Sequence, residues 1–402
     1  MNQKFSKSRS TPSPPPTEAA APWKVPLSDI RVTDEMMAAV EQAVSSGWWS
    51  MGPRVSEFER AFAGYVDTPH ALAVANGTAA LHVALLAIGC GPGDEVVLPS
   101  LNFVAAANTI VHTGATPVFC DIRGGDDLNH DPADLEAALG PATKAVVLLH
   151  FGGFACDVGP VLELARARGI AVIEDAAHAP GSRWEGQACG TIGDIGCFSF
   201  FSNKNMPVGE GGMVVTASDE LAESLRLFRS HGMTTLTWDR HRGHASTYEV
   251  VQPGFNYRLD ELRAAMGIVS LARLDDENAA RRRVALRYRD ALQGERGLAL
   301  AFADRIGDET SSHHLAIALL PPGVSRDDVR ATLAEKRVQT SVHYPPIHRF
   351  AAYREAAAAR PLPRTEELES RIVTLPLFGH LTDEQVDLVT TSLLEAVAGQ
   401  LR

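Results

Sequence analysis

A single lysine stands where amine chemistry is possible. Lys204 follows an apolar run at residues 197–201 and precedes a glycine-rich turn at 209–212. A lysine that is partly desolvated in such a place has a lowered pKa, and its free amine can form a Schiff base with a carbonyl group. The alternative is an ordinary solvated lysine on the surface, which is where single lysines are usually found.

A carboxylate ends another apolar run. Asp175 lies in the segment I-E-D-A-A-H, at residues 173–178, directly after a stretch that is typical of a buried strand. Burying a carboxylate without a partner is costly, and a protonated pyridine nitrogen would be a suitable partner. A helix cap or an ion pair with an arginine elsewhere in the chain would satisfy Asp175 equally well.

A third group is suited to binding a phosphate. The segment N-G-T-A-A, at residues 76–80, stands at a turn from a strand to a helix. Gly77 permits close approach of the backbone, and Thr78 and Ala79 would present unpaired N–H groups at the helix N-terminus. The same pattern is also compatible with ordinary N-capping of the helix by Thr78.

The elements around these residues predict an α/β fold. Short runs of Val, Ile and Leu alternate with helical segments, which is typical of a mostly parallel sheet covered on both faces. In such sheets ligands bind beyond the carboxyl ends of the strands, where all three groups stand. The expected strands are residues 70–75, 95–99, 117–122, 144–150, 170–174, 197–201 and 213–216, and the expected helices among them are 78–88, 103–112, 132–139 and 158–168.

Outside this alternation we expect two N-terminal helices and a different C-terminal region. The first helix covers residues 34–46, and the second begins at Ser56 with a capping box to Glu59. After residue 271 comes an Arg-rich helix, then strands at 313–319 and 339–342 and a final helix from Asp383 to Val397, opened by Thr382. We therefore predict a disordered tail at 1–22, a large domain at 23–271 and a smaller α+β domain at 272–402.

Composition restricts the class of partner and compartment. The formal net charge is −12, without a long basic run, which argues against nucleic acid or an anionic membrane as the main partner. No apolar stretch approaches the ~20 residues of a membrane span. The five cysteines are scattered and never spaced as CxxC, so we expect no disulfide framework, no metal site and a cytoplasmic location.

With these residues assembled, the sequence resembles the DegT/DnrJ/EryC1/StrS family of aminotransferases, which have the fold of type I pyridoxal 5'-phosphate (PLP) enzymes. The resemblance runs from about residue 30 to residue 397. The motifs that carry it are MGPRVSEFE (51–59), ANGTAAL (75–81), PSLNFVAA (99–106), GATPVF (114–119), IEDAAHAPG (173–181), SFFSNKN (199–205), GEGG (209–212), PGFNYRL (253–259) and HYPP (343–346).

The resemblance implies a role for each candidate residue. Lys204 is implied to be the Schiff-base lysine, Asp175 the partner of the pyridine nitrogen, and Phe103 an aromatic residue against the cofactor ring. The phosphate is implied to bind Gly77, Thr78, Ala79 and Ser199, and also Asn256 of a neighbouring subunit, which requires a homodimer.

Two positions depart from the family pattern. His178 stands where Gln is frequent, although His can also donate to the cofactor's phenolate oxygen. Asn203 stands where Ser or Thr is common, which leaves in doubt a phosphate or substrate contact from this position. Trp48, Trp49, Met51, His343 and Tyr344 are candidates for lining the substrate entrance, and the two tryptophans are equally compatible with the core.

By the same resemblance, the reaction moves an amino group from an amino acid, glutamate in many relatives, to a keto-sugar that is usually nucleotide-activated. PLP would cycle through pyridoxamine phosphate, with Lys204 as the acid–base group. Three alternatives stay open: a ketone without a nucleotide, such as a cyclitol; a PLP-binding regulator without turnover; and a relative that removes a sugar hydroxyl. Lys204 argues against the last, because that branch has His at this position.

Overall fold

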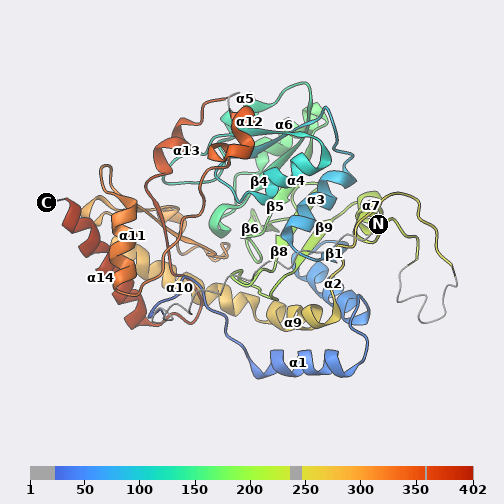
Figure 1. Cartoon of the computed structure of the whole chain (residues 1–402), viewed down its shortest axis with the longest axis horizontal. Helices are drawn as coiled ribbons and strands as arrows, with labels where there is room; N and C mark the ends of the chain where they lie inside the picture. Colours follow the sequence, from blue (N-terminus) through green and yellow to red (C-terminus); the bar gives the residue numbers. More distant parts are fainter. Residues whose placement is uncertain (1–22, 236–246, 358–359, 402) are drawn as a thin grey trace, which may run out of the picture.

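A seven-stranded sheet forms the centre of the molecule. The computed structural model describes residues 23–235, 247–357 and 360–401, and it is shown in Figure 1. The strand order is β1-β9-β8-β5-β4-β2-β3. The strands are β1 (His70–Val74), β2 (Glu95–Pro99), β3 (Thr116–Cys120), β4 (Thr143–Leu149), β5 (Ala171–Asp175), β8 (Ile195–Ser199) and β9 (Gly212–Thr216).

This sheet is mostly parallel, as the continuous apolar runs predict. Strands β8, β5, β4, β2 and β3 pair in parallel, whereas β9 runs antiparallel to both of its neighbours. Successive side chains point to opposite faces, so Val96 and Leu98 enter the core on one face and Val97 enters the core on the other. Both faces are buried, which explains why polar residues in these strands occur only at the strand ends.

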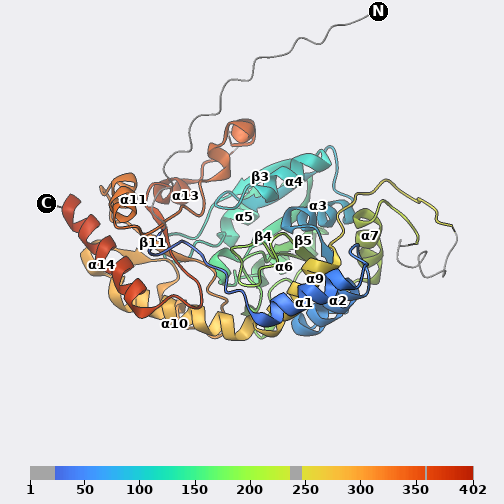
Figure 2. The same ribbon diagram turned by 60° about the horizontal axis from the view of Figure 1, so that its bottom comes forward.

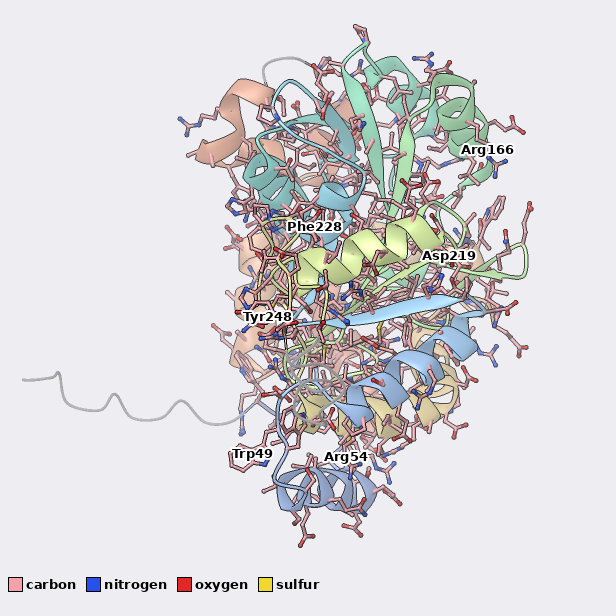
Figure 3. The ribbon with its side chains drawn as sticks, turned by 90° about the vertical axis from the view of Figure 1, so that its right-hand side faces the viewer. Trp49, Arg54, Arg166, Asp219, Phe228 and Tyr248 are labelled. Carbon is pink, nitrogen blue, oxygen red and sulfur yellow. The ribbon has the colours of Figure 1, made fainter. Side chains whose placement is uncertain are left out.

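Helices cover the two faces. One face is packed against α3 (Gly77–Ala87), α4 (Ala105–Thr113) and α7 (Asp219–Arg229). The other face is packed against α2 (Pro53–Val66) and α9 (Glu261–Ala272) at one end and α5 (Pro132–Ala138) and α6 (Gly159–Arg168) at the other. Figure 3 shows α7, with Asp219 and Phe228 toward its two ends, on one side of β1 and α2 on the other.

A second core lies in the C-terminal region. It contains the antiparallel sheet β10-β11-β12, made of Ala299–Leu300, Ala316–Leu319 and Ile372–Leu375. The helices α10 (Leu274–Leu292), α11 (Arg326–Glu335) and α14 (Asp383–Gln400) pack against it. Figures 1 and 2 show α10 extending from α9 toward α14, so this helix links the two regions.

Contacts cross the division that we expect at residue 271. Near the N-terminus, Val25 pairs with Val338 and is buried in the C-terminal core. Residues after 271 likewise contact the large central sheet region: Tyr353 packs on Phe119, and the backbone N–H of Thr365 donates to Asp121. The domain boundaries therefore stay a prediction, and the tail at 1–22 lies outside the described residues.

Two expectations about local structure are wrong. Helix α2 begins at Pro53, one turn before Ser56, and Ser56 Oγ donates to the carbonyl of Gly52 instead of forming a capping box. The carboxylate of Glu59 turns away to accept from the N–H of Ala73 and from Arg229. Residues 339–342 form no strand but only an isolated bridge from Ser341 to Thr374, a residue of β12.

The position of Glu59 leads to a prediction about stability. Arg229 is buried with only 3% of its surface exposed, and Glu59 is its anionic partner. We expect Glu59→Gln to lower the free energy of unfolding by about 2–3 kcal/mol, because a buried guanidinium loses its counter-charge. Urea denaturation measures this change. The matched control is Glu223→Gln, whose ion pair with Arg226 is far more exposed and whose loss should cost less than about 1 kcal/mol. Equal effects of the two substitutions would contradict the prediction.

Among the described residues, none of the helices combines the length and the apolar character that crossing a bilayer requires.

Candidate active site

A cavity of about 410 Å³ opens at the carboxyl ends of the central strands. Leu149, Asp175 and Ser199, the last residues of β4, β5 and β8, lie on its wall. Seven of the nine predicted site residues line it, namely Gly77, Thr78, Phe103, Asp175, His178, Ser199 and Lys204. Residues from separate parts of the sequence are thus brought together at one edge of the sheet, as expected for an open α/β fold.

Lys204 is held partly out of water between this cavity and α10. Its segment leaves β8, and the N–H of Lys204 donates to the carbonyl of Phe201. The pKa of the Lys204 amine is lowered to about 8, mainly by burial; the charge of Asp175 opposes this shift, and the charge of Arg281 adds to it. A substantial fraction of the amine is therefore neutral near pH 8, which is the form that attacks a carbonyl carbon.

Asp175 is a buried carboxylate at the end of β5. Its Oδ1 accepts from the N–H of Ala177 at 3.1 Å, and only 5% of the residue is exposed. Burial raises the pKa of the Asp175 carboxyl, while the Ala177 hydrogen bond and the charge of Lys204 act in the opposite direction. A cationic ring nitrogen placed beside Asp175 would favour the ionised carboxylate.

The turn from β1 to α3 forms another wall of the cavity. The N-cap of α3 is Asn76 and not Thr78, and Asn76 Oδ1 accepts from the N–H of Ala79 at 2.8 Å. The expectation that Ala79 presents an unpaired N–H is therefore wrong, and Ala79 does not line the cavity. Gly77, Thr78 and Ser199 remain there, at the positive end of the helix dipole, which favours an anion.

Gly77 is required by close packing. A Cβ atom at this position would lie 2.8 Å from Cβ of Ser199, so β8 and the start of α3 would be forced apart. We expect Gly77→Ala to weaken PLP binding about 10- to 100-fold, because overpacking of this size costs about 1–3 kcal/mol. Titration of the protein with PLP, followed by absorbance, measures the affinity. Gly64→Ala in α2 is the control, since nothing lies within 4 Å of its Cβ. The prediction fails if both variants bind PLP equally well.

His178 has a defined hydrogen-bonding state. Burial lowers the pKa of its imidazole well below the usual value, so the ring is neutral. Because Nδ1 accepts from the N–H of Gly152 at 3.3 Å, the proton is on Nε2, which faces Tyr344 Oη at 2.7 Å. His178 can therefore donate a hydrogen bond from Nε2, as the expected contact with a phenolate oxygen requires.

Aromatic rings enclose the same space. Tyr344 stacks on His178 with ring centroids 5.8 Å apart, and Phe103 lies 5.8 Å from Tyr344. Phe103 is 54% exposed although it is a large apolar residue, because it lines the open side of the cavity. Such a wall suits a flat aromatic ligand.

Two residues that line the cavity each have a buried polar side-chain atom without a hydrogen-bond partner, namely Asn102 (Nδ2) and Asn203 (Oδ1). Buried polar groups are normally satisfied, so these two atoms indicate a polar ligand. Together with an amine, a buried carboxylate and a helix N-terminus, they fit the aldehyde, ring nitrogen and phosphate of PLP. The residues present are those that this cofactor needs.

The remaining expected positions divide into those that line the cavity and those that lie away from it. Asn256 is exposed and bridges to Ser230, so its contact with the phosphate of a neighbouring subunit stays a prediction. His343 and Tyr344 line the cavity, whereas Trp48, Trp49 and Met51 do not. Trp49 is 59% exposed, which excludes it from the core (Figure 3).

Sequence reasoning missed Asn102 and His314. Asn102 immediately precedes Phe103 in the motif PSLNFVAA, whose aromatic residue was the expected contact with the cofactor. Asparagine is so common in loops that its presence there does not indicate ligand binding. His314 lies 110 residues after Lys204 and approaches it only through the fold. The expectation of a strand over 313–319 gave no reason to assign it chemistry.

Comparison with known proteins shows to which family the chain belongs. The DegT/DnrJ/EryC1/StrS aminotransferase family matches residues 31–394. The spore coat polysaccharide biosynthesis protein SpsC of Bacillus subtilis (strain 168) is 40% identical over 385 residues, which are 94% of this chain and 97% of SpsC.

Solved structures are similar over the same length. The aminotransferase TlmJ from Streptoalloteichus hindustanus is 34% identical with a TM-score of 0.87, and the match covers 94% of this chain and all of TlmJ. DesI, solved in the presence of its TDP-sugar product, is 32% identical with a TM-score of 0.83, and the match covers 94% of each chain. These similarities confirm the resemblance that the motifs indicate, including the fold of type I PLP enzymes. The chain therefore belongs to the DegT/DnrJ/EryC1/StrS aminotransferase family, and it is a PLP-dependent aminotransferase.

Proposed function

We propose that this enzyme transfers an amino group from glutamate to a nucleotide-activated keto-sugar. The observation that carries the proposal is the convergence of Lys204, Asp175 and the start of α3 on one cavity. Similarity to DesI, a protein solved with a TDP-sugar product, supports the nucleotide-sugar part of the proposal. Glutamate as amino donor rests on the family resemblance.

Each residue of the site has a proposed task toward PLP. Lys204 would hold the aldehyde, Asp175 the ring nitrogen, His178 the phenolate oxygen, and Gly77, Thr78 and Ser199 the phosphate. Bound there, PLP supplies an electron sink that stabilises negative charge on the substrate carbon. Phe103 would cover the ring, and Ala79 would take part only if the phosphate replaced Asn76 as the acceptor for its N–H.

The chain's contribution to the reaction is proton transfer and orientation. Because its pKa is about 8, Lys204 can both accept and return a proton at the substrate carbon under neutral conditions. The unpaired Nδ2 of Asn102 and Oδ1 of Asn203 can bind hydroxyl groups of a sugar. Both residues line the cavity that also contains Lys204, so a polyhydroxylated substrate would satisfy groups that an apolar one would leave buried and unpaired.

We further propose that the enzyme acts as a homodimer in the cytoplasm. Asn256 is exposed outside the cavity of its own chain, which is compatible with a contact to the partner's cofactor. All five cysteines are free, which suits a reducing compartment. Small-angle scattering or ultracentrifugation of the full chain tests the dimer, and a monomeric active enzyme would refute it.

A two-stage experiment tests the reaction. The PLP-loaded enzyme is first mixed with glutamate, and conversion to the amine form of the cofactor is followed by absorbance. The amine form is then presented with a panel of nucleotide-linked keto-sugars, free keto-sugars and cyclitol ketones, and return of the aldehyde form is measured. Return with the nucleotide-linked sugars supports the proposal, whereas return only with cyclitols would favour the alternative substrate. No conversion by glutamate or other amino acids would indicate a regulator instead of a transaminase.

A further inference from the structure

The imidazole of His314 is directed at the amine of Lys204. His314 lies just before β11, and its backbone N–H donates to the carbonyl of Gly152. Its Nε2 is 3.5 Å from Nζ of Lys204, and only 4% of the residue is exposed. A buried imidazole beside the one lysine that lines the cavity in the described part of the chain needs a physical explanation.

The neighbours of His314 determine which of its nitrogens carries the proton. Nδ2 of Asn205 donates to the carbonyl oxygen of Ser312 and to Oδ1 of Asn278, both at 2.7 Å. Because a backbone carbonyl can only accept, this fixes the orientation of the Asn205 amide. Its Oδ1 therefore faces Nδ1 of His314, at 2.9 Å, and must accept a hydrogen bond from the N–H at Nδ1.

A second asparagine supports this orientation. Nδ2 of Asn278, on α10, donates to the carbonyl of Pro180 at 3.0 Å, which leaves Oδ1 of Asn278 as the acceptor for Asn205. The chain of hydrogen bonds from Pro180 to His314 thus has one consistent direction. At its end, Nε2 of a neutral His314 has a lone pair that points to Lys204.

Burial and the neighbouring basic groups keep the His314 ring neutral. Lys204, His178, His343 and Arg281 all face it, with the His178 ring centroid at 4.6 Å and Nη1 of Arg281 at 3.5 Å from the carbonyl of His314. Burial, and then the charge of Lys204, lower the pKa of His314 well below its usual value. Asp175 is the anionic group that faces Lys204 itself.

We propose that His314 is a positioning residue that accepts a hydrogen bond from the Lys204 amine whenever this amine is not bonded to the cofactor. This inference rests on the proposed function, in which Lys204 must leave the cofactor and then move a proton. A free lysine side chain has many rotamers, and a fixed acceptor reduces them to those that keep Nζ near the substrate carbon. His314 itself gains and loses no proton.

Two substitutions separate this role from simple packing. In His314→Gln, the longer amide can place Oε1 where Nε2 stands, so the acceptor for Lys204 is retained. In His314→Asn, the shorter amide can still donate to Asn205 but cannot reach Lys204. The two variants are both neutral, polar and smaller than histidine, and they differ in which neighbour they can contact.

The readout is the pKa of Lys204 in the full chain freed of cofactor. The rate of acetylation of Lys204 is measured against pH by mass spectrometry, with Lys144 as the internal standard. We expect a midpoint near pH 8 for the original sequence and for His314→Gln. For His314→Asn we expect a midpoint lower by about one unit, because the ammonium form loses an acceptor. An unchanged midpoint in His314→Asn would overturn the proposal.

A second measurement uses the original sequence, so it does not depend on whether a variant folds. In the full chain labelled with ¹⁵N-histidine, we expect the His314 signal of the tautomer protonated on Nδ1. The tautomer protonated on Nε2 would overturn the proposal. Both measurements are independent of substrate, so a failure of the keto-sugar assay would refute the proposed function and leave this inference standing.

Kinetics then connect the contact to turnover. We expect kcat of His314→Asn to fall about tenfold, with the KM for the amino donor nearly unchanged, because the contact orients Lys204 and does not bind substrate. A rise in KM at constant kcat would show that His314 binds substrate and would contradict the positioning role.

Discussion

Replacing Lys204 by alanine is expected to lower the rate of amino transfer by about 10⁴-fold, the upper end of what one positioned acid–base group contributes. Lys204 is the one lysine on the cavity wall in the described part of the chain, and its lowered pKa suits it to proton exchange near neutral pH. Single-turnover conversion of the PLP form by glutamate measures the effect without interference from product release.

The control for Lys204→Ala is Lys144→Ala. Lys144 lies near the start of β4, at the end of the strand opposite the cavity, so its loss removes an amine without touching the site. Added methylamine should restore part of the Lys204→Ala rate, because a small amine can occupy the space and carry the proton. A Lys204→Ala enzyme that keeps more than a tenth of the original rate would contradict the assignment.

Asp175→Asn should reduce the same half-reaction about 10²- to 10³-fold, comparable to the loss of one preorganised electrostatic group in other active sites. The neutral amide can no longer stabilise a positive charge on the ring nitrogen, so the cofactor becomes a weaker electron sink. The buried position of Asp175 makes this effect large, since water cannot replace the lost charge.

Asp194→Asn provides the comparison for Asp175→Asn. Asp194 precedes β8, and its carboxylate accepts from the N–H of Val172 near the opposite end of the same strands. Asparagine can still accept that hydrogen bond, so we expect the rate to change less than twofold. If both substitutions slowed the reaction equally, the cause would be a general disturbance of the sheet and not the charge of Asp175.

Local signals in the sequence were sufficient for the elements that carry the site. Strand β2 has the predicted bounds, 95–99, and the strands before Asp175 and Lys204 are displaced by only one or two residues. Runs of β-branched and apolar residues bounded by glycine and proline are short-range features, so they can be read without knowing the fold. The capping of α14 by Thr382 is of the same kind, and it is present with Gln385 as its reciprocal partner.

The expectations that failed depend on partners distant in the sequence. Ser56 and Glu59 have the spacing of a capping box, but Arg229 and the N–H of Ala73 bind the Glu59 carboxylate. Residues 339–342 have the composition of a strand, yet only Ser341 pairs with another strand, at Thr374 of β12. Ala79 was expected to leave its N–H free, although the neighbouring Asn76 was equally able to cap it.

Residue types and spacing along the chain were enough to single out Lys204, Asp175 and the turn at Gly77 as candidates, and the family motifs were enough to predict an aminotransferase. The tertiary structure decided which groups surround them. His314 and Asn278 approach Lys204 and Asn205 from more than 70 residues away, and the tautomer of His314 depends on that approach. The direction of a hydrogen bond and the burial of a group depend on neighbours in space. The hydrogen bonding and the pKa of Lys204 are therefore set only when the chain is folded.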